Sequence, residues 1–221
     1  MTTSRRSFIK TSAVAGGAIG LGVLPGTAAS PLPAAEPRPR TERAAKPLRI
    51  LILGGTGFTG PYQVRYAVER GHHVTVFNRG RRQADLPKSV EHLVGDRNGQ
   101  LDALKGKKWD AVIDVPSTYP RWVRDAATLL KDSANHYVFI STISVYADTS
   151  KPGINESSPL ATMPDPTVEE MRFYGAMKAL AEAEAEKAFP GRTTVIRPGL
   201  IVGPGDMSDR FSYWQIGRAH V

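Results

Sequence analysis

The sequence predicts an α/β fold built around a doubly wound parallel sheet. Short apolar runs alternate with helical patterns from residue 48 onward, and parallel neighbouring strands need a crossover, which helices provide. The first run, Leu48 to Leu53, holds only Leu and Ile apart from Arg49, which is typical of a strand buried on both faces of such a sheet. Glycines and then a helical pattern follow this run directly.

The glycine turn Gly54-x-x-Gly57-x-x-Gly60 predicts an anion site, because free backbone N–H groups and the positive end of a helix dipole face one point there. Gly54 would permit the turn, Gly57 would let the backbone approach a phosphate, and Gly60 would let the helix pack closely on the strand. A purely structural glycine turn is the alternative. The predicted ligand is the pyrophosphate of a dinucleotide, bound by Gly54, Thr56, Gly57, Phe58 and Gly60.

The rest of the chain continues the alternation of strands and helices. We expect strands at residues 73–77, 90–94, 111–115, 136–140 and 193–196, and helices at residues 61–70, 101–104, 122–131 and 168–189. Ligands of such sheets lie outside the carboxyl ends of the strands. The loops that follow the strands therefore carry the candidate functional residues.

The segment after the second strand, Asn78-Arg79, bears on the choice of nicotinamide cofactor. An acidic residue there favours NAD, whereas a basic residue accommodates the 2′-phosphate of NADP. No acid occurs before Asp85, and Arg79 can pair with a phosphate. NADP is therefore favoured over NAD, with a solvated basic loop as the alternative. After the third strand, Asp96 either accepts a hydrogen bond from the adenine amino group or caps the turn.

Tyr174 and Lys178 are separated by one turn of the last predicted helix, so both side chains occupy one helix face. The ammonium group can then stabilise the phenolate and make Tyr174 a better base. A hydroxyl group from the end of the fifth strand, in the segment Ser141-Thr142-Ile143-Ser144, would orient the substrate oxygen. These side chains together predict an acid/base centre.

Four motifs occur in order along the chain: Gly54-x-x-Gly57-x-x-Gly60, Ser141-Thr142-x-Ser144-Val145-Tyr146, Tyr174-x-x-x-Lys178 and Arg197-Pro198-Gly199-Leu200-Ile201-Val202-Gly203-Pro204. They resemble the extended short-chain dehydrogenase/reductase family, specifically the NAD-dependent epimerase/dehydratase group, over residues 49–205. The resemblance implies a Rossmann-type fold and hydride transfer between a substrate carbon and the nicotinamide C4. It further implies a catalytic hydroxyl at Thr142, with Ser141 and Ser144 as alternatives, Tyr174 as general acid/base, and Lys178 as the residue that activates Tyr174 and holds the ribose.

Two departures mark an atypical member of this family. Asn78-Arg79 replaces the acid common in sugar-nucleotide epimerases, and Pro116-Ser117-Thr118 lacks their usual Ala-Ala pair. The resemblance implies action on a hydroxyl or keto carbon of a sugar-like substrate, nucleotide sugars included, and leaves epimerase, dehydratase and reductase open. Some atypical members of the family, which are related to chloroplast stem-loop RNA-binding proteins, bind RNA on the same fold. The alternative is therefore a non-catalytic protein that binds a nucleotide or RNA.

The first 47 residues contain two segments that precede the sheet. Residues 1–29 hold Ser-Arg-Arg-x-Phe-x-Lys at positions 4–10, an uncharged apolar run too short to span a bilayer, and small residues at positions 27–29. This pattern resembles a twin-arginine (Tat) signal peptide and predicts export to the periplasm, the cell envelope or the medium. Residues 30–47 are rich in proline, and we expect an extended linker.

Charge and composition weigh against a nucleic-acid partner. Of the formal net charge of +8, five units lie in residues 1–47, so the rest of the chain lacks the basic stripe of an RNA-binding surface. The absence of cysteine excludes disulfides, Cys-ligated zinc and thiol nucleophiles, and the histidines show no ligand spacing, so no metal is expected. The expected partners are a small-molecule substrate, the Tat export machinery and a second copy in a homodimer, without a membrane in the mature form.

The predicted sheet domain covers residues 48–205, and residues 206–215 would begin a substrate-binding lobe. The last residues, Ile216-Gly217-Arg218-Ala219-His220-Val221, match the translation of a widely used sequencing adapter. We therefore expect that the natural reading frame continues past Gln215, that most of the substrate lobe is missing, and that this chain alone turns over little.

Overall fold

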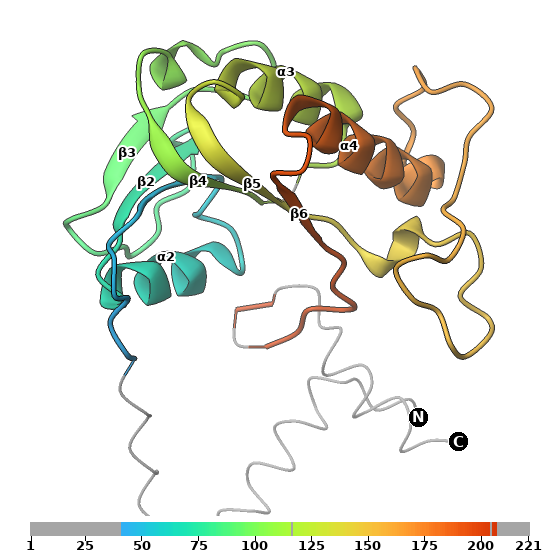
Figure 1. Cartoon of the computed structure of the whole chain (residues 1–221), viewed down its shortest axis with the longest axis horizontal. Coiled ribbons are helices and arrows are strands. Elements are labelled where there is room, and N and C mark those ends of the chain that lie inside the picture. Colours follow the sequence, from blue (N-terminus) through green and yellow to red (C-terminus); the bar gives the residue numbers. More distant parts are fainter. Residues whose placement is uncertain (1–40, 116, 204, 207–221) are drawn as a thin grey trace, which may run out of the picture. The chain divides into compact units, whose positions relative to one another are not determined.

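The computed structural model describes residues 41–115, 117–203 and 205–206. Within them, one sheet has the strand order β3-β2-β1-β4-β5-β6, and all neighbouring strands are parallel (Figure 1). The predicted doubly wound parallel sheet is confirmed. The strands are β1 (Arg49–Leu53), β2 (His73–Asn78), β3 (Glu91–Val94), β4 (Trp109–Asp114), β5 (Ala134–Ile140) and β6 (Thr193–Ile196).

Helices cover both faces of this sheet. Helix α2 (Gly60–Glu69) lies on one face, whereas α3 (Pro120–Leu130) and α4 (Tyr174–Ala188) lie side by side on the other (Figure 1). Short 3₁₀ turns occur at η1 (Asp102–Leu104), η2 (Ile143–Val145) and η3 (Met171–Phe173). In the part of the chain that the structure describes, no helix combines the length and the apolar character needed to cross a membrane.

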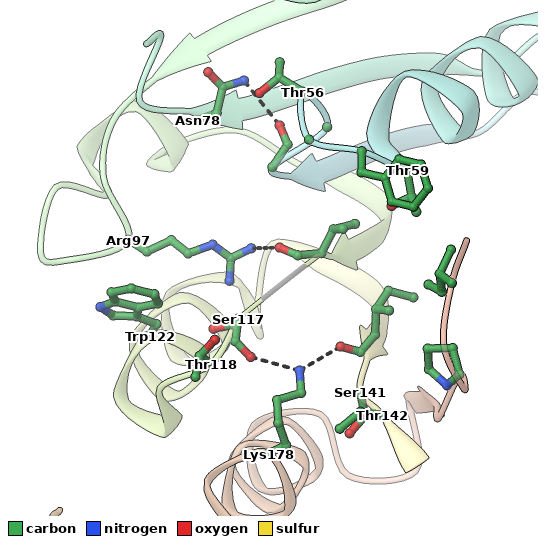
Figure 2. Close-up of a pocket in the computed structure, with 18 of the residues that line it drawn as sticks. Thr56, Thr59, Asn78, Arg97, Ser117, Thr118, Trp122, Ser141, Thr142 and Lys178 are labelled. Atoms are coloured by element: carbon green, nitrogen blue, oxygen red, sulfur yellow. Dashed lines mark hydrogen bonds between the residues drawn. The ribbon is translucent and has the colours of Figure 1, made fainter. Parts of the chain in front are cut away.

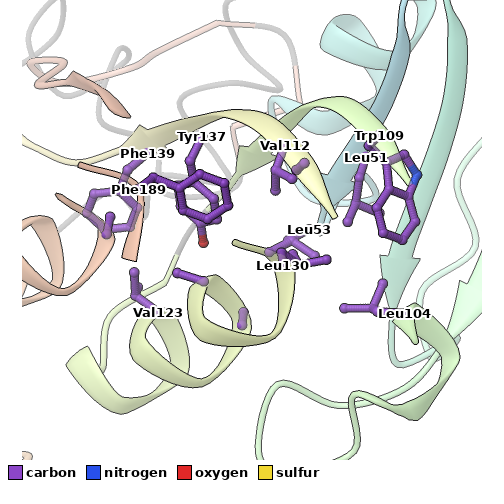
Figure 3. Packing of buried hydrophobic residues seen from close by; sticks show 14 of the residues in the cluster. Leu51, Leu53, Leu104, Trp109, Val112, Val123, Leu130, Tyr137, Phe139 and Phe189 are labelled. Atoms are coloured by element: carbon purple, nitrogen blue, oxygen red, sulfur yellow. The ribbon is translucent and has the colours of Figure 1, made fainter. Parts of the chain in front are cut away.

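Two apolar clusters, one on each face of the sheet, hold these layers together. The larger cluster joins the sheet to α3 and α4 and includes the fully buried Tyr137 (Figure 3). The smaller cluster joins α2 to β1 and β2. Because alternate residues of a strand point to opposite faces, β1 contributes to both clusters, with Leu51 and Leu53 in the larger one and Ile50 and Ile52 in the smaller one.

The last predicted helix, at residues 168–189, begins later than the sequence pattern indicates. Helix α4 starts at Tyr174 and follows the 3₁₀ turn η3. Before it, the carboxylate of Asp165 accepts hydrogen bonds from the N–H group of Thr167 at 2.9 Å and from its hydroxyl group at 2.7 Å, so the chain forms a local turn there. Tyr174 consequently lies at the N-terminal end of a helix rather than in its interior.

The last part of the predicted linker contacts the C-terminal end of α2. The hydroxyl group of Thr41 donates to Glu69 at 3.0 Å, and the N–H group of Ala44 donates to the carbonyl oxygen of Arg70 at 2.9 Å. The predicted signal peptide, most of the linker, the start of the substrate lobe beyond residue 206 and the adapter-like residues 216–221 lie outside the described residues.

Arg197, the first residue after β6, ties that strand to α4. Its guanidinium donates to both carboxylate oxygens of Glu182, at 3.1 Å and 2.7 Å, and to the hydroxyl group of Tyr146 at 3.2 Å. The hydrogen bonds to Glu182 raise the pKa of Arg197 above its usual value. A bidentate pair of this kind fixes the geometry of both side chains as well as adding energy.

Arg197→Met should lower the free energy of unfolding by about 3 kcal/mol, because the Glu182 side chain, 7% exposed, would remain buried without its partner. Arg172→Met is the matched control, since Arg172 pairs with Glu170 and both side chains are more than half exposed. A change below about 1 kcal/mol is expected for that variant. Urea unfolding followed by circular dichroism measures both, and equal losses would contradict the role of Arg197.

Candidate active site

A cleft of about 910 Å³ lies at the carboxyl edge of the sheet. Its lining begins at the glycine turn between β1 and α2 and ends at η2, the first turn of α4 and the segment after β6 (Figure 2). Segments far apart in the sequence meet there because the carboxyl ends of parallel strands share one edge. With the exception of Gly60, every predicted cofactor-binding and catalytic residue lines this cleft.

The glycine turn combines left-handed backbone with unused N–H groups. Gly54 and Gly55 have φ angles of 117° and 82°, a region that residues with a Cβ atom avoid. The N–H group of Gly54 donates to the carbonyl oxygen of Phe77 at 2.8 Å, whereas the N–H groups of residues 55–58 donate to no other described residue. Free donors at the start of a helix are suited to bind an anion, so this arrangement agrees with the predicted site.

Gly57 and Gly60 differ in what surrounds them. A Cβ atom on Gly60 would lie 2.5 Å from the carbonyl oxygen and 2.8 Å from the Cα atom of Gly55. Gly60 therefore lets α2 pack against the turn itself, and the expected close approach to the strand is wrong in this detail. A Cβ atom on Gly57 would meet no atom within 4 Å. Gly57 thus borders open space in the cleft, where a phosphate can approach the backbone.

Asn78 supports the glycine turn from the end of β2. Its side-chain amide donates to the carbonyl oxygen of Gly54 at 3.2 Å. Arg79 follows on an exposed loop and lines the cleft together with Arg81 and Arg82. Three cations therefore lie on the loop after β2, beside the glycine turn. Among them, the sequence pattern predicts a cofactor contact for Arg79 alone.

Asp96 and Arg97 line the cleft after β3. Asp96 accepts a hydrogen bond from the N–H group of Asn98 at 3.0 Å, so the turn-capping interaction is present, and contact with adenine stays a prediction. Arg97, which the sequence pattern did not single out, contacts the carboxylate of the buried Asp114 at 2.5 Å. The sequence signal that could have revealed this pair was Asp114, a charged residue at the end of strand β4. A buried carboxylate needs a partner, so Asp114 indicates a cation nearby.

Lys178 lies at the other end of the cleft and is only 2% exposed. Its ammonium group donates to the carbonyl oxygens of Ser117 at 2.9 Å and Ile140 at 2.8 Å (Figure 2). Burial lowers the pKa of Lys178 to about 8, and the carboxylates of Asp114 and Glu182 oppose this shift. The charge of Lys178 is therefore sensitive to its neighbours near neutral pH.

Hydroxyl groups line the cleft at the ends of β4 and β5. The Oγ1 atom of Thr142 accepts from the N–H group of Ser144 at 3.1 Å and donates to its hydroxyl group at 3.2 Å. The hydroxyl groups of Ser117 and Ser141 are buried and have no hydrogen-bond partner among the described residues. Because buried polar groups are normally paired, each is available to a molecule bound in the cleft.

Tyr174 lines the cleft from the start of α4, one helical turn before Lys178. The next residue, Gly175, allows this placement, because a Cβ atom there would overlap the carbonyl oxygen of Ser144. Helix α4 therefore approaches η2 more closely than a residue with a side chain would permit. Thr142, Tyr174 and Lys178 all line this cleft.

The residues of the cleft fit a dinucleotide cofactor. The free N–H groups at the start of α2 suit a pyrophosphate, the cations after β2 suit a ribose phosphate, and the unpartnered hydroxyl groups suit polar atoms at the far end. The described residues contain no group of three or more His, Cys, Asp or Glu side chains that could hold a metal ion. Fold and cleft together have the features of the α/β class of dinucleotide-binding proteins.

The chain belongs to the NAD dependent epimerase/dehydratase family, whose sequence model matches residues 50–220. A model of the twin-arginine translocation (TAT) pathway signal matches residues 2–22. Both the predicted family and the predicted export signal are confirmed.

Three similar proteins indicate how far the likeness extends. A 2-alkyl-3-oxoalkanoate reductase of Stenotrophomonas maltophilia is 33% identical over 178 residues, which are 72% of this chain and 52% of the relative. The chloroplast stem-loop binding protein of 41 kDa b of Arabidopsis thaliana is 29% identical over 119 residues, 47% of this chain and 31% of the relative. A solved UDP-galactose 4-epimerase aligns with a TM-score of 0.60 and 24% identity over 78% of this chain and 63% of its own. The chain thus spans less than two thirds of each of these proteins, and the structural likeness establishes the fold.

Proposed function

We propose that the protein is an NAD(P)-dependent enzyme that epimerises, dehydrates or reduces a substrate at a hydroxyl or keto carbon. One observation carries this proposal: a single cleft joins the free N–H groups of the glycine turn to Thr142, Tyr174 and Lys178 at its other end. Membership of a family of epimerases and dehydratases supports it, as does the likeness to a reductase. When bound, the nicotinamide accepts or donates the hydride.

Tyr174 and Lys178 form the acid/base part of the proposed site. Tyr174 exchanges a proton with the substrate oxygen while the attached carbon loses or gains a hydride. An ammonium group has three donors, and Lys178 uses two of them on the carbonyl oxygens of Ser117 and Ile140. The proposed role of the third donor is to bind a ribose hydroxyl, beside the contact of Nζ with the Phe139 ring at 4.1 Å from its centroid, and the positive charge would stabilise the phenolate of Tyr174.

Thr142 is the proposed donor to the substrate oxygen. Its hydroxyl oxygen caps η2 as an acceptor, so rotation of the O–H bond away from the Ser144 hydroxyl group redirects the donor to a substrate while the cap is kept. Ser141, whose hydroxyl group is buried without a partner, is the alternative donor. Thr142→Val and Ser141→Ala distinguish the two, because only the residue that binds the substrate oxygen lowers kcat when its hydroxyl group is removed.

We propose a sugar-like substrate, with nucleotide sugars included. The fold is shared with a UDP-galactose 4-epimerase, while the relative from S. maltophilia is named for a 2-alkyl-3-oxoalkanoate. The test uses protein expressed from the complete natural reading frame, incubated with NADPH or NADH, UDP-sugars and 3-keto acids. Turnover of the sugars supports the proposal, and turnover of the keto acids alone overturns the choice of substrate class.

Arg79 supports a preference for NADPH over NADH. Arg79→Ala should weaken NADPH binding by about tenfold, because one charge-assisted contact to the 2′-phosphate is lost, and should leave NADH binding unchanged. Lys88→Ala is the matched control, since Lys88 is an exposed cation outside the cleft. Fluorescence titration with each reduced cofactor measures the effect. Tighter binding of NADH in the parent protein would contradict the preference.

A non-catalytic nucleotide-binding or RNA-binding protein is the second candidate. The observation that favours it is the likeness to a chloroplast stem-loop binding protein, together with the cations Arg79, Arg81 and Arg82 in the cleft. Fluorescence anisotropy with a stem-loop RNA at about 50 and 200 mM salt tests it, because phosphate contacts weaken steeply with salt. Salt-dependent RNA binding without any turnover would replace the first proposal.

We also propose that the protein is exported in its folded state, with the cofactor bound, to the periplasm, the cell envelope or the medium. The match to a twin-arginine signal supports export by this route. The Tat machinery is thus a proposed partner, and a homodimer stays a prediction. Fractionation of the native host and cofactor analysis of the exported protein test both parts of the proposal.

A further inference from the structure

Arg97 and Asp114 form a buried ion pair beside the cleft. The two charged groups are 2.5 Å apart, and their side chains are 12% and 0% exposed. The second carboxylate oxygen of Asp114 accepts a hydrogen bond from the hydroxyl group of Tyr137 at 2.5 Å. Burial, followed by the charge of Asp114, raises the pKa of Tyr137 well above its usual value, so Tyr137 remains a donor. The ion pair at one oxygen and the hydrogen bond at the other offset part of the cost of desolvating the carboxylate, while the Nη1 atom of Arg97 is buried without a hydrogen-bond partner among the described residues.

Arg97 also joins the ends of two strands. Its Nη2 atom donates to the carbonyl oxygen of Leu53, at the end of β1, at 2.8 Å. It also donates to the carbonyl oxygen of Val115, just after β4, at 3.0 Å (Figure 2). β1 and β4 are the neighbours at which the strand order reverses, which is where ligands of such sheets bind. Arg97 therefore fixes the backbone at the middle of the cleft.

Lys178 is attached to the same edge of the sheet. It donates to the carbonyl oxygens of Ser117 and Ile140, so two cations hold the backbone at the ends of β1, β4 and β5. Val115 and Ser117 lie only two positions apart, and each is held by one of these cations. A displacement of this short segment by loss of Arg97 would therefore move an acceptor of Lys178.

We infer that Arg97 and Asp114 are positioning residues for Lys178. Arg97 fixes the strand ends on which Lys178 is held, and Asp114 supplies negative charge that keeps its ammonium group protonated. This inference rests on the proposed function for the use of Lys178, but the arrangement itself is independent of any cofactor or substrate.

The charged groups that face Lys178 come from three elements. Burial lowers the pKa of Lys178, the carboxylate of Asp114 on β4 opposes this most strongly, Glu182 on α4 opposes it next, and Arg97 after β3 adds to the lowering. Among the described residues, Tyr174, one turn earlier on α4, and Tyr137, which donates to Asp114, are further titratable groups. Because Arg197 already neutralises Glu182, loss of Asp114 would remove the main support for the charge of Lys178.

Asp114→Asn tests the electrostatic part of the inference. An NMR titration of ¹³C-lysine-labelled protein, with the Lys178 signal assigned by its absence in Lys178→Met, should show the midpoint shifted downward by about one pH unit. Asp110→Asn is the matched control: Asp110 is also on β4, but its carboxylate accepts from the N–H group of Arg49 at 2.7 Å. Its removal should leave the midpoint unchanged.

The double variant Arg97→Met/Asp114→Asn keeps the test decisive if the single variant does not fold, because it removes both buried charges together. Its Lys178 midpoint should also shift downward, by less than in Asp114→Asn, since the two removed charges act in opposite directions. NADPH affinity should fall by about tenfold in the double variant, in which Arg97 no longer fixes the acceptors of Lys178. Lower thermal stability with an unchanged Lys178 midpoint would show a merely structural role and overturn the inference. The titration contains neither cofactor nor substrate, so failure of the proposed function would leave its result intact.

Discussion

Tyr174→Phe is expected to lower kcat by about 10³-fold, within the range that a general acid/base contributes. The substitution removes only the hydroxyl group and keeps the aromatic ring that lines the cleft. The dissociation constants of NADPH and NADH should therefore stay within about twofold of those of the parent, because the glycine turn and Lys178 are untouched. Steady-state kinetics with the substrate found by the screen and fluorescence titration of the cofactors measure the two effects separately.

Tyr66→Phe is the matched control for Tyr174→Phe. Tyr66 lies on α2, is 54% exposed, and accepts a hydrogen bond from Arg70 at 3.3 Å. Loss of its hydroxyl group should change neither kcat nor cofactor affinity. If Tyr174→Phe kept most of the parent turnover, Tyr174 would not be the acid/base residue. A large loss of cofactor affinity instead would make it a binding residue.

The parts of the molecule that follow from local sequence were predictable. The sixth strand, Thr193–Ile196, has the predicted bounds, because all four of its residues are β-branched and such residues favour strands without reference to distant neighbours. Tyr174 and Lys178 share a helix face wherever that helix packs. The glycine turn likewise depends on backbone freedom at consecutive positions, which the residue types alone reveal.

The parts that depend on distant neighbours were not predictable in the same way. Arg97 and Asp114 form an ion pair between segments that are separated in the sequence. The residues that flank each of them do not indicate which residue it pairs with. The start of helix α4 at Tyr174, directly after the 3₁₀ turn η3, does not follow from the residue types at positions 168–173. Gly175 is required by the carbonyl group of Ser144 on another element, so its role appears only when both elements are placed.

Gly60→Ala and Gly57→Ala should separate the two uses of glycine at the cofactor turn. Gly60→Ala forces a Cβ atom to within 2.5 Å of the carbonyl oxygen of Gly55, and backbone cannot yield as a flexible side chain does. We expect a loss of about 2–3 kcal/mol in the free energy of unfolding, with weaker cofactor binding as a consequence of the displaced turn. Thermal and urea unfolding, together with NADPH titration, measure these effects.

Gly57→Ala should instead weaken cofactor binding without loss of stability. A Cβ atom on Gly57 meets no protein atom within 4 Å and needs no left-handed backbone, so the stability should change by less than about 1 kcal/mol. The added methyl group would occupy space next to the free N–H groups, and the dissociation constant of NADPH should rise by at least about tenfold if the pyrophosphate lies there. Parent-like NADPH affinity in Gly57→Ala would place the pyrophosphate elsewhere, and the anion site at the start of α2 would then lack its proposed ligand. A loss of stability equal to that of Gly60→Ala would show that Gly57 is also a packing residue.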